Sequence, residues 1–177
     1  MGRKLWPPLI ALVTLSSGTA IGSPSAEVAL ATPFAEVAAR FPLNADLALG
    51  GRFQLVDGRA LRLGPTIRKE WGSLGPARLR GEVLLARSFG ISTASTFDAE
   101  VVQELLLPLD VASWATLRLG LIGYFGPTRP QTGLVGYGAL RVSRDLGSGL
   151  TLGFELGWLA NPHAHRPLLA IILGQAF

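Results

Sequence analysis

Hydrophobic and polar residues alternate along the chain from Asn44 to the C-terminus. In the segment 45–55, the odd-numbered positions are apolar or glycine, whereas the even-numbered positions include Asp46, Arg52 and Gln54. Because the side chains of a strand point alternately to its two faces, a period of two predicts a β-strand with one apolar face. Eight segments show this pattern: 45–55, 60–71, 77–89, 97–107, 115–125, 134–143, 150–159 and 167–177.

The stretches between these segments are rich in turn-forming residues. Examples are Asp57-Gly58 and the stretches 72–76 and 145–149, which favour reversal of the chain. The segments are about 10–13 residues long, longer than most strands of soluble sheets and close to what a tilted membrane-spanning strand requires. The pattern therefore predicts an all-β fold: an antiparallel up-and-down transmembrane β-barrel of about eight strands, with a short N-terminal segment.

The charged residues of these strands gather on one face. The opposite face carries Lys69 and Arg87, both near strand ends. A soluble sheet would turn its charged face to water, and this alternative stays open because the alternation alone does not say which face is wet. In a membrane barrel, the apolar face contacts lipid and the polar face lines the lumen. The inward face would then carry Asp46, Arg52, Arg62, Arg68, Glu70, Arg78, Arg80, Glu82, Asp98, Glu100, Glu104, Arg118, Arg141 and Glu155.

Acidic and basic residues are equally frequent on this face, and all the basic ones are arginines. The planar guanidinium group suits paired carboxylates, so a closed lumen would let these charges neutralise one another. Glu104 should lie between Arg80 and Arg118 on the neighbouring strands. We therefore predict a charge network that plugs the lumen and includes Arg78, Arg80, Glu82, Glu100, Glu104, Arg118, Arg141 and Glu155.

Aromatic residues fall near both ends of the predicted strands, as interfacial residues of membrane barrels do. Trp71, Trp114 and Phe177 are expected at one rim. The other rim would carry Phe53, Phe89, Phe97, Tyr124, Phe125 and Trp158. Trp114 and Tyr124 depart from the pattern, because both fall on the inward parity.

The N-terminus has the organisation of a secretory signal peptide. Arg3 and Lys4 precede the apolar stretch Leu5–Leu15, and the small residues 16–20 follow it. Cleavage after Ala20, Gly22 or Ala26 is compatible with this pattern. This apolar stretch is shorter than the roughly 20 residues that a spanning helix needs, which argues against an uncleaved membrane anchor. The 177 residues include no cysteine, so disulfide scaffolds and Cys-ligated metal sites are excluded.

The segment 27–43 does not follow the strand alternation cleanly. Thr32 and Pro33 resemble an N-cap and a first helical residue, and the apolar residues that follow have helical spacing. We predict a short amphipathic helix here, and the alternative is that 26–41 forms the first strand. The expected organisation is a signal peptide (1–26), this N-terminal segment (27–43) and a β-barrel (44–177).

The strand pattern, the signal peptide and a terminal phenylalanine together resemble the small eight-stranded outer-membrane barrels of Gram-negative bacteria, the type formed by the membrane domain of outer-membrane protein A and by outer-membrane protein X. The resemblance covers about residues 44–177. It implies a C-terminal signal, read by the barrel-assembly machinery, in which a final aromatic residue follows alternating apolar residues. Leu173 and Phe177 match this assembly signal, whereas Gln175 departs from it.

The chain offers few candidate catalytic groups. His163 and His165 share one turn, with no serine nearby for a hydrolase and no carboxylate within several residues for a metal site. Glu100 and Glu104 would lie about 13 Å apart along a strand, too far for glycoside hydrolysis, and their pairing with Arg80 and Arg118 on the neighbouring strands is favoured. We therefore expect no enzymatic activity, no cofactor and no metal site.

The expected function is that of an integral outer-membrane barrel with a structural, anchoring or partner-scaffolding role. Its expected partners are outer-membrane lipid and lipopolysaccharide, the barrel-assembly machinery and an envelope protein. Nucleic acid is not expected as a partner, because the formal charge of +4 is spread over single basic residues without a basic patch. A small passive pore is the alternative, and a lipid-modifying barrel enzyme or a soluble periplasmic barrel ranks behind it.

Overall fold

The computed structural model describes residues 23–177 except 33, 58–59, 91–95, 127–132 and 162–163. Ten β-strands follow one another in this part of the chain. They are β1 (Ser25–Thr32), β2 (Phe34–Pro42), β3 (Leu47–Val56), β4 (Ala60–Leu74), β5 (Ala77–Gly90), β6 (Thr96–Pro108), β7 (Ser113–Phe125), β8 (Gly133–Gly147), β9 (Leu150–Asn161) and β10 (Ala164–Ala176). No helix within the described ranges is long and apolar enough to cross a membrane.

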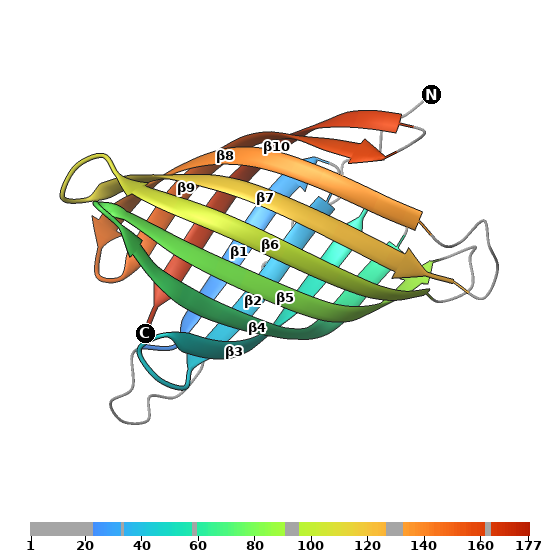
Figure 1. The fold of residues 1–177 in the computed structure, drawn as a ribbon, viewed down its shortest axis with the longest axis horizontal. Helices are drawn as coiled ribbons and strands as arrows, with labels where there is room; N and C mark the ends of the chain where they lie inside the picture. Colours follow the sequence, from blue (N-terminus) through green and yellow to red (C-terminus); the bar gives the residue numbers. More distant parts are fainter. Residues whose placement is uncertain (1–22, 33, 58–59, 91–95, 127–132, 162–163) are drawn as a thin grey trace, which may run out of the picture.

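The strands form one closed barrel in which each strand pairs antiparallel with its sequence neighbours (Figure 1). The barrel closes between β1 and β10, from Ser25 opposite Ala176 to Thr32 opposite Leu169. Closure pairs every strand on both sides and leaves no edge. A sheet inside a membrane requires this, because no water is present there to form hydrogen bonds with unpaired backbone N–H and C=O groups. The predicted antiparallel up-and-down barrel is confirmed, but it has ten strands in the described residues instead of eight.

The two additional strands come from the segment predicted to be a short helix. It forms β1 and β2, so both the helix and the alternative of a single strand over 26–41 are wrong. Thr32 ends β1 and does not cap a helix, and Pro33 lies outside the described residues. The physical reason is tertiary: a short helix gains only about 0.2–0.5 kcal/mol from each favourable side-chain pair, whereas β1 and β2 each form ladders on both sides.

The other eight strands, β3 to β10, coincide with the eight predicted segments to within a few residues at their ends. The largest extensions are in β4 and β8, which continue beyond the predicted ends at 71 and 143. Each of these strands contains a register shift, between Glu70 and Gly72 in β4 and between Asp145 and Gly147 in β8. Such irregularities interrupt the strict alternation that the prediction followed.

Because the number of strands is even, the first and last strands have their outer ends on the same side of the barrel, which we call the terminal end. There the Phe177 N–H donates to the Pro24 carbonyl oxygen at 2.8 Å. The β6–β7 turn at this end is fixed by Asp110, whose carboxylate accepts the Ala112 N–H at 2.7 Å. This hydrogen bond lowers the pKa of Asp110. Residues 1–22, including most of the predicted signal peptide, lie outside the described residues.

The opposite end, which we call the loop end, is where β1, β3, β5, β7 and β9 finish. The connections between strands at this end fall largely on residues 33, 58–59, 91–95, 127–132 and 162–163, outside the described residues.

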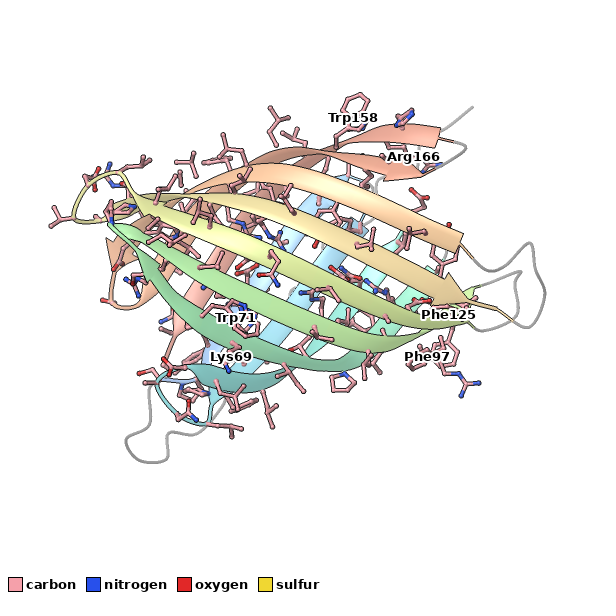
Figure 2. All side chains as sticks on the ribbon, viewed as in Figure 1. Lys69, Trp71, Phe97, Phe125, Trp158 and Arg166 are labelled. Carbon is pink, nitrogen blue, oxygen red and sulfur yellow. The ribbon has the colours of Figure 1, made fainter. Side chains whose placement is uncertain are left out.

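The apolar parity points away from the barrel axis. Leu119, Phe154 and Leu156 lie on this face and are 57%, 57% and 66% exposed. Figure 2 shows side chains of this kind surrounding the ribbon on all visible sides. A soluble monomer would not expose an apolar surface of this extent, because soluble monomers rarely expose contiguous apolar patches larger than a few hundred Å².

Aromatic side chains on this outer face lie near the two ends of the barrel. Trp71 is exposed towards the terminal end, whereas Phe97, Phe125 and Trp158 are exposed towards the loop end (Figure 2). The two charged residues predicted on the outer face both contact aromatic rings: Lys69 Nζ lies 5.0 Å from the centre of the Trp71 ring, and the Arg87 guanidinium lies over Phe89. The distribution is typical of interfacial belts.

The middle of the barrel is filled by inward-facing side chains. Every strand contributes at least one that is no more than 5% exposed: in strand order, Ala29, Ala38, Arg52, Thr66, Glu82, Val102, Thr116, Ala139, Glu155 and Ala170. An eight-stranded barrel is just wide enough for its side chains, so ten strands enclose more space. Long arginine and glutamate side chains occupy that additional space.

Candidate functional site

The inward-facing charged residues form one continuous network of ion pairs across the lumen. Its N–O distances are 4.0 Å or less, and most of its arginines contact two or more carboxylates. The members of this lumen network among the described residues are Glu27, Glu36, Arg40, Arg52, Arg62, Arg68, Glu70, Arg80, Glu82, Asp98, Glu100, Glu104, Arg118, Arg141 and Glu155.

Glu82 on β5 is the centre of one part of the network and is 2% exposed. Its Oε2 accepts from Arg40 Nε at 3.0 Å and from Arg68 Nε at 2.8 Å, and its Oε1 accepts from Arg52 Nη2. Arg40 comes from β2 and crosses the lumen to reach it. Gly50 on β3 lies beside this arginine, and a Cβ there would overlap the Ala39 carbonyl oxygen and lie 3.1 Å from Arg40 Cγ.

A second part of the network runs from β5 to β9. Glu104 accepts from Arg80 Nε at 2.6 Å and from Arg118 Nε at 2.8 Å. Arg118 also donates to Glu155 at 2.8 Å, and so does Arg141. Arginines and carboxylates thus alternate along a series of ion pairs that connects five successive strands, which is the condition under which buried charges are tolerated.

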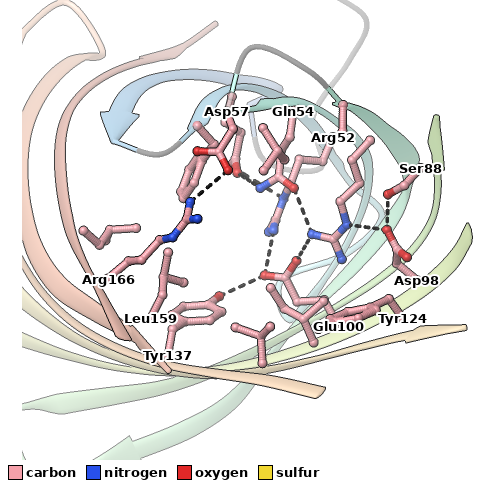
Figure 3. A pocket seen from close by; sticks show the side chains of 18 of the residues that line it. Arg52, Gln54, Asp57, Ser88, Asp98, Glu100, Tyr124, Tyr137, Leu159 and Arg166 are labelled. Carbon is pink, nitrogen blue, oxygen red and sulfur yellow. Dashed lines mark hydrogen bonds and ion pairs between the residues drawn. The ribbon is translucent and has the colours of Figure 1, made fainter. Parts of the chain in front are cut away.

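A third part centres on Glu100, on the loop-end side of the network (Figure 3). Its Oε1 accepts from Arg52 Nη1 at 3.0 Å and from the Tyr137 hydroxyl at 2.9 Å, and its Oε2 accepts from Arg62 Nη1 at 2.5 Å. The Tyr137 ring lies over Gly120, where a Cβ would overlap the ring carbons. A glycine on β7 is therefore needed for this tyrosine on β8 to lie in the lumen.

The structure brings together seven of the eight residues predicted for the lumen network: Arg80, Glu82, Glu100, Glu104, Arg118, Arg141 and Glu155. The eighth, Arg78, has the inward parity but lies exposed near the terminal end. It takes part in none of the ion pairs found among the described residues, so its placement in the network is wrong. The reason is its position in β5, opposite Ser73 in the protruding part of β4.

Glu104 contacts both arginines that its neighbouring strands place opposite it, Arg80 and Arg118. Glu100 was expected to pair with the same arginines, and this expectation is wrong. Its guanidinium partners belong to β3 and β4, which are not adjacent to β6. Such contacts cross the lumen and depend on the cross-section of the closed barrel.

Several other network members were not predicted from the sequence. Arg52, Arg62, Arg68, Glu70 and Asp98 were recognised on the charged parity but not as part of the network. Glu27, Glu36 and Arg40 were missed because their segment was assigned to a helix. The available signal was the alternation of Glu36, Ala38 and Arg40, all of which point inward from β2.

A cavity of about 420 Å³ lies between the network and the loop end (Figure 3). Network residues of β3, β4 and β6 form its inner limit, and apolar and aromatic side chains of five other strands contribute to its wall. Near its mouth, Arg166 Nη1 on β10 donates to Asp57 at 2.9 Å. Both of these side chains are about half exposed. Tyr124, which the sequence places near this rim on the inward parity, points inward and lines the cavity.

The other candidate groups are not assembled into a site. Among the residues that the structure describes, no three His, Cys, Asp or Glu side chains are grouped so as to hold a metal ion. His165 is exposed on β10, and His163 lies outside the described residues. Leu173 and Phe177 are exposed on the outside of the barrel near the terminal end. Their role as an assembly signal stays a prediction.

Comparison with protein-family models found no match for the chain, and none of the curated proteins is similar to it in sequence. Solved structures do match. A bacterial polysaccharide outer-membrane secretin is similar with a TM-score of 0.54 and 14% identity, over 81% of this chain and 56% of the secretin chain. At this identity the likeness shows the fold alone.

Two further matches have lower scores. The outer-membrane protein Ail of Yersinia pestis is 9% identical, with a TM-score of 0.47, over 88% of this chain and 99% of Ail. A KdgM porin in complex with disordered oligogalacturonate is 9% identical, with a TM-score of 0.48 and the same coverage. Of these three matches, the outer-membrane secretin has a TM-score above 0.5, and it supports the closed β-barrel fold that the strand order shows.

Proposed function

We propose that this chain is an integral outer-membrane protein whose lumen is closed to solutes and whose role is structural, anchoring or scaffolding. The observation that carries this proposal is the filled middle of the barrel, where each of the ten strands contributes a buried inward side chain. A pore wide enough for hydrated solutes needs water-exposed side chains at every level of its lumen. Glu82, Glu100 and Glu104 are each no more than 3% exposed.

The location in a membrane is supported by the outer surface. Apolar side chains cover it between two groups of aromatic residues, and the charged residues are turned inward into ion pairs. This is the reverse of the arrangement in a soluble sheet, which exposes its charges. Fractionation tests this part: the chain should enter the outer membrane and change its gel mobility on boiling, whereas recovery as a soluble periplasmic protein would contradict it.

The closed lumen is tested by recordings in planar lipid bilayers. The unmodified protein should give no stable conductance. The double substitution Arg52→Ala with Glu82→Ala removes a buried ion pair that spans from β3 to β5 and should produce a small conductance. Leu119→Ala, which shortens an exposed outward side chain, is the matched control and should stay silent. A stable conductance of porin size from the unmodified protein would overturn the proposal.

A small passive pore is the second candidate, and the cavity at the loop end is the observation that favours it. The cavity reaches from the rim to Arg118 and Glu155 in the lumen, so part of a channel is already open. In that case the network would have to rearrange to let ions pass. The unmodified protein would then show conductance, and weakening the network would increase it by a modest factor only.

A further inference from the structure

The loop-end cavity combines two surfaces of different chemistry. Its wall is mainly apolar and is built from inward-facing residues of strands around the barrel: Phe34, Val56, Ile122, Val135, Leu159 and Leu168. Its inner limit is formed by Arg52, Arg62, Glu100 and Tyr137 of the lumen network. A volume of about 420 Å³ is in the range of sites that enclose small organic molecules, and such sites are mostly apolar with a few convergent polar groups.

The polar groups at the inner limit are not fully satisfied. Arg62 Nη2 is buried and has no hydrogen-bond partner among the described residues. Arg52 Nε is also buried and makes no hydrogen bond there, although Glu36 Oε1 lies 3.6 Å away. The side chains of Arg52 and Arg62 are 2% and 7% exposed, and both line the cavity. A buried donor without an acceptor costs free energy, and more so when it belongs to a charged group. Both unsatisfied atoms are donors, so the missing group is an acceptor.

The carboxylates of the same region are, by contrast, already engaged. Glu100 accepts three hydrogen bonds, and Asp98 accepts from Arg62 Nε at 3.2 Å and from Thr96 Oγ1 at 3.0 Å. At the mouth, Arg166 is paired with Asp57. Glu36, which also lines the cavity, accepts from Gln54 Nε2 at 2.6 Å. Among the described residues, a cationic ligand would therefore find no carboxylate without a partner, whereas an acceptor oxygen would find the two arginines.

From this arrangement we propose that the cavity is a binding site for a small amphipathic carboxylate with an apolar body. The carboxylate lies at the arginine-lined inner limit, and the body fills the apolar region between it and the mouth. The site lies on the loop-end side of the lumen network and shares Arg52, Arg62 and Glu100 with it, but ligand binding there does not depend on whether the barrel conducts ions. The volume suits a single ring or a short chain and not a lipid with several acyl chains.

The test uses the full chain in lipid nanodiscs, with phenylpropionate as the probe and ligand-detected NMR as the readout. Nanodiscs without protein provide the blank for partition into lipid. Phenylpropionate should bind, phenylpropionamide should bind more weakly, and the cation phenylpropylamine should show no binding above the blank. Equal binding of all three probes, or no binding of phenylpropionate, would overturn the proposal.

Substitutions test whether the probe binds inside the barrel. Ile122→Trp adds volume inside the cavity and should abolish binding, whereas Leu121→Trp, at the neighbouring outward position, should leave it unchanged. Arg62→Gln should weaken phenylpropionate binding by about tenfold, since it removes a charged donor, with little effect on the amide. If Arg62→Gln does not fold, the tryptophan pair decides: binding that survives Ile122→Trp would refute the site.

Discussion

Glu82 is the position at which removal of a charge should cost the most stability. Substitution by glutamine preserves its volume but removes the carboxylate shared by three arginines. After this substitution, Arg52 still has an ion pair with Glu100 at 3.0 Å, and Arg40 still has one with Glu27 at 4.0 Å. Arg68 keeps no carboxylate within ion-pair distance among the described residues. Loss of one partner of a buried pair costs about 3–5 kcal/mol, and we expect Glu82→Gln to reduce the free energy of unfolding by this amount.

The matched control is Glu70→Gln, which makes the same replacement of a carboxylate by an amide at the rim of the barrel. Glu70 is 32% exposed and lies 3.8 Å from Arg80, which keeps Glu104 at 2.6 Å. Exposed pairs contribute about 0–1 kcal/mol, so this variant should unfold close to the unmodified protein. The assay is a urea titration of the barrel folded into lipid vesicles, with the folded fraction measured by gel mobility without boiling.

A second substitution should restore part of the stability that Glu82→Gln removes. Adding Arg68→Met to Glu82→Gln removes the guanidinium left without a carboxylate and should recover part of the lost stability, since replacing a whole buried pair is far less costly than breaking it. Equal unfolding midpoints for Glu82→Gln and Glu70→Gln would refute the reasoning, because they would mean that the interior is solvated as well as the rim.

Three further outcomes are expected. Leu119→Arg should destabilise the folded barrel in vesicles by about 2–4 kcal/mol, and an effect below about 1 kcal/mol would argue against lipid contact at this position. Gly120→Ala should displace the Tyr137 ring and change the near-UV circular dichroism, whereas Gly136→Ala, whose added Cβ has its nearest neighbour at 4.0 Å, should not. Deletion of 27–41 removes most of β1 and β2 and should abolish the heat-modifiable folded band; a folded band that persists would show that eight strands can close alone.

Strands β3 to β10 of this barrel could be predicted well because the alternation of side chains is a local property. These eight of the ten strands follow from the period of two alone. The first two strands do not, because β1 and β2 are rich in alanine, which fits a strand face and a helix equally. Only pairing with β10 and β3 distinguishes the two states, and pairing is a tertiary property.

The ion pairs of the lumen network could likewise be predicted only where they join neighbouring strands. Arg80 lies directly opposite Glu104 in the ladder, and Arg141 lies directly opposite Glu155, so strand order is sufficient to pair them. The ion pair between Arg52 and Glu82 joins β3 and β5, which are not neighbours. Contacts of this second kind depend on the number of strands, and a prediction that starts from eight strands cannot place them.

The network explains two features of the composition: the charged residues on the inward face of the strands, and the use of arginine instead of lysine there. A barrel with apolar residues on both faces would have no preferred register, because a slip by one residue exchanges the two faces without penalty. In this barrel the same slip would turn Glu82 and its arginine partners towards lipid, where each arginine near the midplane costs about 2–4 kcal/mol. The charges therefore oppose misregistered pairing on every strand that carries them. Arginine suits this role better than lysine, since its fork can contact two carboxylates at once, as Arg118 does with Glu104 and Glu155.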